Sequence, residues 1–481
     1  MNVFSKIGIC ALTGCVAIGA AMAGEPVLGY QLDVSRGKIP TMKTLYRIVD
    51  TIADLGYRQF QLYGENYFKY RGHEKVSYPD AMTADEVRQL DDYCAKRGIE
   101  LVPNQNSFGH MEPWLVEYPE LAELPKGKVV TISPNWVLDK PKTLCPTDPR
   151  SIALVDDIHG QFLPCFRSRL FNVGCDETFE LIYATNQTRS AAAIAEKGAV
   201  RLYFEFLMKV HELVAKRNHR MMFWADIILH RPEFVSELPK DVIALNWGYE
   251  ANHPFEKQTA ALEKSGREFY VCPGTSAWKS LSGRTDNMME NIDNAMSAGF
   301  RHGMGGVMLA DWGDEGHAQP FLSSVPALVY AAHRFRGEKL TFGQLAAAID
   351  KFLGCKVGES LLRYGNLYKL CGATRGNATY LAMWLIQGRE FKRPKGMTDE
   401  ALKATFAERD SARKARDLTG APDWVRDGFE TIDLLYDAVE ACARGEFGTI
   451  RRRFETRYRE LWLRHNRYSG LDDSIIKNLP E

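Results

Sequence analysis

Hydrophobic positions follow two alternating patterns from residue 27 to about residue 310. Short apolar runs, which are typical of buried strands, alternate with stretches in which apolar residues recur at helical spacing. The first strand is predicted over Val27–Asp33. The helix that follows it carries Leu45, Ile48 and Ile52 on one face and ends at Gly56. Alternation of this kind is typical of parallel βα units.

Eight apolar runs in this region are predicted to be strands. They are Val27–Asp33, Gln59–Tyr63, Ile99–Pro103, Arg167–Phe171, Met221–Trp224, Val242–Trp247, Glu268–Cys272 and Gly306–Ala310. Eight repeated βα units predict an α/β fold of the (β/α)8 TIM-barrel type. An open doubly wound sheet is the alternative, but no GxGxxG or GxxxxGK[ST] motif follows any of these strands. The nucleotide-binding forms of that sheet are therefore disfavoured.

The pattern changes after about Lys339. Thr341 and Gln344 form a predicted capping box, and Leu345, Ile349 and Leu353 follow at helical spacing. No strand pattern recurs from there to the end of the sequence. We therefore predict a signal peptide over residues 1–23, a catalytic barrel over 24–340 and a C-terminal α-helical domain over 341–481.

The first residues have the composition of a secretory signal peptide. Lys6 precedes the apolar run Ile7–Met22, and Ala21–Ala23 is a small-residue cleavage site, so we predict export to the periplasm or the medium with cleavage after Ala23. Leu12–Cys15 also resembles a bacterial lipoprotein box, which leaves a lipid anchor at Cys15 as the alternative. No later stretch is long and apolar enough to be predicted as a membrane span.

Composition is ordinary for a soluble globular protein, with 45% hydrophobic and 25% charged residues in a chain of 481. Lysine plus arginine equals aspartate plus glutamate, at 61 each, so nothing favours a nucleic acid or an anionic membrane as a partner. Two of the ten cysteines lie in the predicted signal, and the others lack CxxC spacing. We expect buried thiols, no metal site and no cofactor.

Chemistry-bearing residues cluster after the predicted strands, where barrel enzymes build their active sites. In strand order they are Arg36, Glu65, His110, Asp176 and Glu177, Trp224 and Asp226, Trp247, Trp278, and Trp312 and Asp314. Tryptophans among acids are typical of a sugar pocket, because pyranose rings stack on indoles and hydroxyls bond to carboxylates. A metal site is less favoured, since neither HxH nor HExxH spacing occurs.

The acid pair Asp176–Glu177 is the candidate catalytic centre. Two adjacent carboxylates push one pKa upward, and a raised carboxyl pKa suits a general acid near neutral pH. The alternative interpretation is that this segment is a solvent-exposed loop whose two acids have no catalytic function.

Several motifs, in this order, resemble glycoside hydrolase family 20, the β-N-acetylhexosaminidases. The matching segments are Asp33–Arg36, Phe108–His110, Leu144–Pro146, Asn172–Glu177, Trp224–Asp226 and Trp312–Asp314. Two further segments, Pro273–Trp278 and Asp311–Asp314, resemble the divergent branch of that family typified by hexosaminidase D. The resemblance implies removal of terminal β-linked N-acetylglucosamine or N-acetylgalactosamine from glycans.

The resemblance also implies a retaining mechanism in which the acetamido oxygen of the substrate attacks the anomeric carbon. Glu177 would act as general acid and base, and Asp176 would orient the acetamido N–H. Arg36, assisted by Asp314, would bind sugar hydroxyls. Further binding roles fall to Asp226 and to the pocket walls Trp224, Trp247 and Trp312, while His110, backed by Glu65, would tune Glu177.

One departure concerns the tyrosine that the family places on its seventh strand to bond the acetamido carbonyl. It is absent from Val271–Ser276, and Tyr249 or Trp278 would have to serve instead. Two other functions therefore stay open: a retaining glycosidase for another sugar, and an inactive carbohydrate-binding barrel. The intact Asp176–Glu177 pair disfavours the second, because a binding module needs no general acid.

Overall fold

The computed structural model describes residues 25–133, 136–184, 186–475 and 479. The predicted signal peptide and the alternative lipid anchor lie outside these residues. Within them, no helix combines the length and apolar character needed to cross a bilayer.

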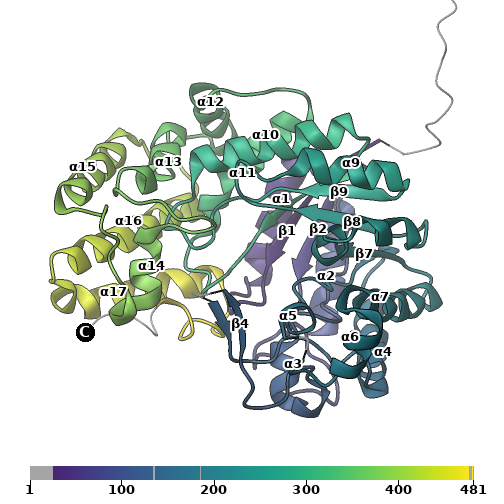
Figure 1. Cartoon of the computed structure of the whole chain (residues 1–481). Helices are drawn as coiled ribbons and strands as arrows, with labels where there is room; N and C mark the ends of the chain where they lie inside the picture. Colours follow the sequence, from purple (N-terminus) through teal and green to yellow (C-terminus); the bar gives the residue numbers. More distant parts are fainter. Residues whose placement is uncertain (1–24, 134–135, 185, 476–478, 480–481) are drawn as a thin grey trace, which may run out of the picture.

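Eight parallel strands form the centre of the molecule (Figure 1). They are β1 (Val27–Asp33), β2 (Gln59–Tyr63), β3 (Glu100–Leu101), β6 (Leu170–Asn172), β7 (Arg220–Trp224), β8 (Ile243–Trp247), β9 (Glu268–Cys272) and β10 (Gly306–Asp311). Their order in the sheet is β3-β2-β1-β10-β9-β8-β7-β6. The two edges meet through a parallel bridge between Asn104 and Asn172, and the amide of Asn172 donates to the carbonyl of Pro103 at 2.9 Å. The predicted TIM barrel is confirmed.

The third strand is shorter than the Ile99–Pro103 that the sequence predicted. Pro103 has no N–H to donate, which interrupts the ladder. The chain nevertheless stays extended, because the amide of Val102 donates to the carbonyl of Phe60 at 2.9 Å and Asn104 pairs with the opposite edge.

Helices cover the outside of the barrel. They are α1 (Met42–Asp54), α2 (Ala84–Lys96), α3 (Glu112–Glu117), α4 (Pro149–Phe162), α5 (Phe179–Tyr183), α6 (Ala191–Lys197), α7 (Ala199–Lys216), α8 (Asp226–Leu229), α9 (Phe255–Ser265), α10 (Thr285–Arg301) and α11 (Val325–Phe335). Helix α2 begins with a capping box, since Thr83 and Glu86 make both of its bonds. A small antiparallel hairpin, β4 (Val130–Ser133) and β5 (Trp136–Leu138), stands out from the long segment after β3.

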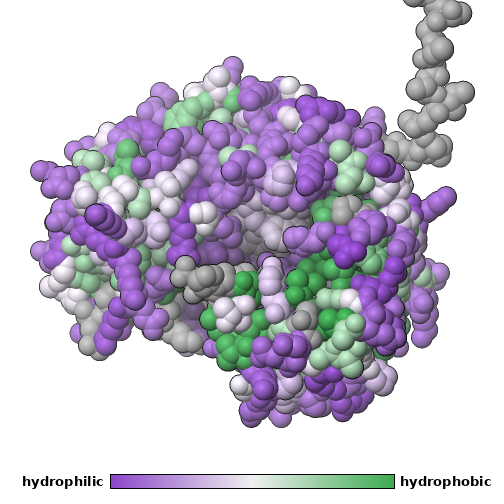
Figure 2. Space-filling view, in the orientation of Figure 1, coloured by the Kyte–Doolittle hydropathy of each residue, from purple (hydrophilic) through white to green (hydrophobic). Residues whose placement is uncertain are grey.

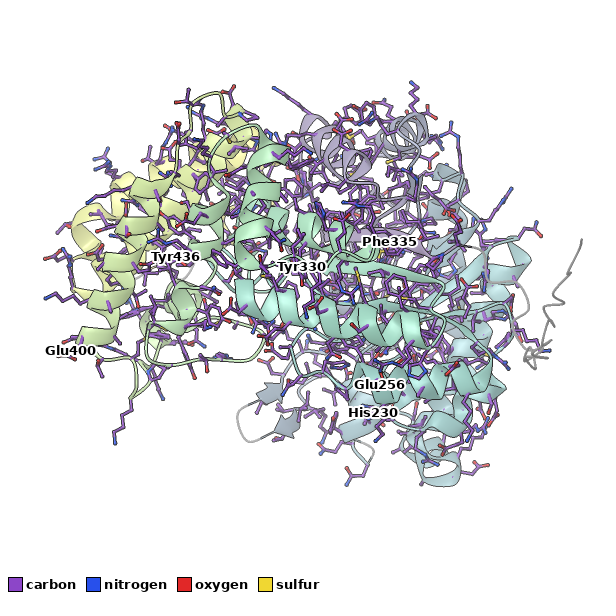
Figure 3. All side chains as sticks on the ribbon, turned by 90° about the horizontal axis from the view of Figure 1, so that it is seen from above. His230, Glu256, Tyr330, Phe335, Glu400 and Tyr436 are labelled. Atoms are coloured by element: carbon purple, nitrogen blue, oxygen red, sulfur yellow. The ribbon has the colours of Figure 1, made fainter. Side chains whose placement is uncertain are left out.

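The C-terminal region is helical, as predicted. It contains α12 (Phe342–Leu353), α13 (Gly358–Tyr364), α14 (Tyr380–Gln387), α15 (Asp399–Ala415), α16 (Asp423–Ala443) and α17 (Phe447–His465). One continuous apolar core joins Ile48 and Leu328 of barrel helices to Phe429 of α16. In Figure 3, Glu400 of α15 lies at one end of the molecule, and Glu256 of α9 lies toward the other. The helical region is therefore packed firmly against the barrel.

Candidate active site

The predicted site residues gather at the carboxyl ends of the barrel strands, where Figure 2 shows a hollow in the middle of the face above β4. A second, smaller apolar cluster fills the inside of the barrel and includes some of these residues. It contains Tyr63, Trp224, Trp278 and Trp312 together with interior residues of the strands. The site is thus built on rigid strand ends over a packed floor.

Arg36 is held at one end of the site by two carboxylates. Its Nη1 atom lies 3.0 Å from Asp33 Oδ2 and 3.4 Å from Glu65 Oε1. Its guanidinium carbon lies 4.6 Å from the centre of the Tyr63 ring and 5.4 Å from that of Trp312. The side chain keeps 20% of its surface exposed. Arg36 is therefore fixed in position with donors left for a ligand.

Asp33 and Glu65 anchor this cation to the fold. Asp33 also accepts bonds from the amides of Ser35 and Gly313, each at 2.9 Å, and Glu65 accepts one from the hydroxyl of Tyr63 at 2.9 Å. Burial raises the pKa of both carboxyls, and the charge of Arg36 opposes that rise.

The loop that carries the acid pair has an unusual backbone. Cys175 and Glu177 have positive φ angles of 67° and 51°, as does Gly174 at 68°. A Cβ atom on Gly109 would overlap the carbonyl oxygen of Asp176, so the two loops approach as closely as glycine allows. Non-glycine residues in this region are strained, and such strain is concentrated at functional sites.

His110 joins the two acids. Its Nε2 atom lies 3.1 Å from Glu177 Oε2 and 3.4 Å from Asp176 Oδ2, and its Nδ1 atom lies 3.8 Å from Glu65 Oε1. Burial disfavours the charged imidazolium, but Asp176 and Glu177 outweigh it and hold the pKa of His110 well above its usual value. The histidine is therefore a cation within the site near neutral pH.

Asp176 presents one oxygen that has no partner. The residue is 5% exposed, and Oδ1 is buried without a hydrogen-bond donor among the described residues. Oδ2, in contrast, faces His110. A buried carboxylate oxygen without a donor is costly, and in native structures such an atom calls for an explanation. A ligand N–H or O–H would supply the missing bond.

Asp226 lies next to this pair, where Oδ2 accepts the backbone amide of Glu177 at 3.1 Å. Burial raises its pKa well above the usual value, and the negative charges of Asp176 and Glu177 add to the rise. Asp226, which the sequence indicated only as a substrate-binding residue, is thus a carboxyl of raised pKa beside the acid pair.

Aromatic side chains form one wall of the site. The rings of Trp224 and Trp312 are 5.9 Å apart, and Trp247 stacks on Tyr249 with 5.2 Å between centroids. Tyr249 also lies 6.4 Å from Trp312. The three tryptophans predicted to wall the pocket are therefore brought together, and Tyr249 joins them.

Trp278 belongs behind this wall. It is 1% exposed, and its indole N–H donates to Asn377 Oδ1 at 2.9 Å. That N–H is therefore not free to bond a ligand, so the expectation that Trp278 contacts substrate directly is replaced by a supporting role. The sequence alone could not reveal this bond, because its acceptor, Asn377, lies in the C-terminal region.

Asp314 completes the rim near Arg36. Its Oδ2 atom lies 3.4 Å from Lys279 Nζ, and both side chains are partly exposed. Lys279 and Tyr63 are site residues that the sequence did not single out. Tyr63, at the end of a predicted strand, has the pattern of an ordinary core aromatic.

Among the described residues, no group of three or more His, Cys, Asp or Glu side chains is placed to hold a metal ion.

The fold and these residues define a (β/α)8-barrel glycoside hydrolase with an acid pair at the fourth strand. The profile of the glycosyl hydrolase family 20 catalytic domain matches residues 65–297. Residues 65–297, just under half of the chain, therefore match a catalytic domain of glycoside hydrolase family 20. The two strands before residue 65 and the helical C-terminal region lie outside the matched segment.

Individual relatives are distant. The chain is 24% identical to hexosaminidase D of Bos taurus over 255 residues, which cover 52% of this chain and 70% of the relative. It is 25% identical to a β-hexosaminidase of Akkermansia muciniphila over 225 residues, which cover 41% of this chain and 44% of that relative. It thus spans less than half of the second protein's length.

A solved structure supports the fold. The chitobiase of Flavobacterium johnsoniae superposes with a TM-score of 0.53, at 14% sequence identity, over 88% of this chain and 72% of that one. At this identity the likeness speaks for the barrel architecture alone.

Proposed function

We propose that the protein is an exo-acting β-N-acetylhexosaminidase that removes terminal β-linked N-acetylglucosamine or N-acetylgalactosamine with retention of configuration. The buried, unpartnered Oδ1 of Asp176 is the observation that carries this proposal. An acetamido N–H is a donor of the required kind. A carboxylate in that position also stabilises the positive charge that the nitrogen gains when the acetamido oxygen attacks the anomeric carbon.

Glu177 is assigned the role of general acid and base. Its side chain is 29% exposed, so it can reach both the leaving oxygen and an incoming water molecule. His110 contacts Glu177 and places beside it a positive charge that the substrate does not supply. The acetamido oxygen acts as nucleophile, so no protein carboxylate forms a bond to the sugar.

Arg36 and Asp314 close the end of the pocket opposite the leaving group and give the enzyme its exo action. Tyr249 is assigned the contact with the acetamido carbonyl, because the N–H of Trp278 is already used by Asn377. Tyr249 thereby takes the role that the family gives to a tyrosine on another strand.

The substrate class is tested with chromogenic aryl β-glycosides of N-acetylglucosamine, N-acetylgalactosamine and galactose. We expect hydrolysis of one or both amino sugars and little of the galactoside. Hydrolysis of the galactoside alone would favour a glycosidase for another sugar, and no hydrolysis of any would favour an inactive binding barrel.

Replacement of Arg36 by alanine is expected to raise KM and lower kcat/KM by about 10- to 150-fold. A hydrogen bond from a charged group is worth about 1.5–3 kcal/mol, and each 1.4 kcal/mol is a factor of ten. The pH profile should keep its shape, because Arg36 does not exchange the catalytic proton. The matched control is Arg58→Ala, an exposed arginine before β2, which should leave the kinetics unchanged. If both variants keep wild-type kinetics, the Asp33–Arg36 motif has only a structural role.

Replacement of His110 by asparagine is expected to move the basic limb of the kcat/KM profile to higher pH. Removal of the imidazolium takes a positive charge away from the acid pair, and a site with less positive charge holds the catalytic proton to higher pH. Asparagine tolerates the positive φ angle of 53° at this position. An unchanged basic limb would contradict a cationic His110.

The same substitution has a consequence for stability. Because the folded-state pKa of His110 is raised, its stabilising contribution is full below its usual pKa and is lost as the pH rises through the raised value. Wild type should therefore exceed His110→Asn in unfolding free energy most clearly at acidic pH, by denaturant titration at several pH values.

We also propose that the protein is exported through the predicted signal peptide. The supporting feature is the pattern Lys6, Ile7–Met22 and Ala21–Ala23. Fractionation of cells that express the full chain, with sequencing of the mature N-terminus, tests this. A mature protein that starts at Gly24 is expected, whereas lipid attached to Cys15 would favour the lipoprotein alternative.

A further inference from the structure

The C-terminal helical region reaches into the wall of the sugar pocket through one short turn. We propose that Asn377, in this turn, is a positioning residue of the active site that fixes Trp278 and Glu250 and, through them, Tyr249. The inference rests on the function proposed above. It gives the C-terminal region a part in catalysis.

Asn377 bonds two neighbouring barrel loops at once. Its side-chain Oδ1 accepts the indole N–H of Trp278, in the loop after β9, at 2.9 Å. Its backbone N–H donates to Glu250 Oε1, in the loop after β8, at 2.6 Å. Arg284, which is 3% exposed, holds the same carboxylate through Nη1 at 3.0 Å and Nη2 at 2.9 Å. Glu250 directly follows Tyr249, so both loops that support the aromatic wall are tied to one residue.

The turn is shaped for this contact. Asn377 has a φ angle of 55°, a left-handed conformation that asparagine tolerates better than most residues. Arg375 and Ala378 pair across the turn, and the amide of Thr379 donates to the carbonyl of Lys279 at 2.8 Å. Thr379 then caps α14 by accepting the amide of Ala382 at 3.1 Å. The turn is thus anchored both to the barrel and to its own helix.

The contact is transmitted to the pocket through packed rings. Trp278 meets Tyr249 edge-on, with 5.0 Å between centroids and 86° between planes. A Cβ atom on Gly274 would overlap the Trp278 ring, so the indole has no space to shift in that direction. Tyr249 in turn stacks on Trp247 at 5.2 Å. A change in the orientation of Trp278 is therefore passed on to the two residues assigned to the acetamido pocket.

Loss of the Asn377 acceptor leaves a buried indole N–H without a partner, which favours other orientations of Trp278. The acetamido pocket should loosen while the acid pair stays intact. We expect kcat/KM to fall by about three- to tenfold. Discrimination against substrates with an N-acyl chain longer than acetyl should weaken, because a wall that yields accommodates a larger group.

The test compares Asn377→Gly with Asn366→Ala. Glycine keeps the left-handed turn and the backbone bond to Glu250, so only the side-chain acceptor is removed. Asn366 also ties the C-terminal region to the barrel, since it exchanges bonds with Asp286 of α10 at 2.8 and 3.1 Å, but it does not contact the pocket wall. It therefore controls for weakened domain packing. Asn377→Asp keeps an oxygen acceptor and should restore wild-type selectivity.

Two readouts decide the outcome. The first is the ratio of kcat/KM for N-acetyl and N-butyryl aryl β-glucosaminides, which should fall in Asn377→Gly and hold in Asn366→Ala and Asn377→Asp. The second is hydrogen–deuterium exchange over residues 247–250, which should rise in Asn377→Gly alone. Equal ratios and equal exchange in Asn377→Gly and Asn366→Ala would overturn the proposal. If the wild-type protein cleaves no amino sugar, the proposed function is wrong. The exchange experiment by itself then still supports or overturns the positioning role of Asn377.

Discussion

Replacement of Glu177 by glutamine is expected to lower kcat/KM for natural glycosides by about 10²- to 10⁴-fold, the usual contribution of a general acid. The amide has the same shape but has no acidic proton to give to the leaving oxygen. Aryl glycosides with activated leaving groups need less protonation and should lose less. The comparison is a series of aryl leaving groups of decreasing acidity, assayed in wild type and variant.

A matched control for this substitution lies on the loop after β10. Glu315 is exposed and has a φ angle of 59°, close to the 51° of Glu177, so Glu315→Gln makes the same change in a similar backbone conformation. It should leave the kinetics unchanged. Equal losses on good and poor leaving groups in Glu177→Gln would remove Glu177 from the acid role.

Replacement of Asp176 by asparagine is expected to lower kcat by about 10²- to 10³-fold, the cost of removing one preorganised electrostatic contact. The acetamido nitrogen becomes partly positive only as the reaction proceeds, so the carboxylate stabilises the transition state more than the bound substrate. An amide offers a dipole without a charge. KM should therefore change less than kcat in steady-state assays.

The same variant makes two further differences measurable. A site without the negative charge of Asp176 holds the catalytic proton less tightly, so the basic limb of the rate profile should move to lower pH, opposite to the shift expected for His110→Asn. A thiazoline that mimics the cyclised intermediate should inhibit wild type strongly and Asp176→Asn weakly. Equal inhibition of both proteins would show that Asp176 does not stabilise that charge.

Most of the barrel could be predicted from the sequence, because strand ends coincide with abrupt changes of pattern. Gln59–Tyr63 and Glu268–Cys272 have the predicted bounds, since each begins after an arginine and ends before a glycine or a proline. The length of the third strand was overestimated. The effect of Pro103 on the hydrogen-bond ladder depends on which neighbouring strand would have accepted the bond that proline cannot donate.

The site was predictable where a residue follows its strand directly. His110 meets Asp176 and Glu177, and Glu65 lies between His110 and Arg36, as expected from their positions after the strands. Three features of the site could not be predicted from the sequence. The pKa of Asp226 depends on burial beside two other acids. The partner of Trp278 lies 99 residues away. Tyr63 matters through its contact with Arg36.

The central claim, that the substrate's own acetamido oxygen is the nucleophile, is tested most directly by aryl β-glucosaminides whose N-acetyl group carries an increasing number of fluorine atoms. Fluorine withdraws electrons from that oxygen and leaves the leaving group unchanged. The account predicts that kcat/KM falls steeply with each added fluorine in wild type. A flat dependence, together with capture of a 2-deoxy-2-fluoro sugar on a protein carboxylate, would contradict substrate assistance and assign an ordinary double displacement to this barrel.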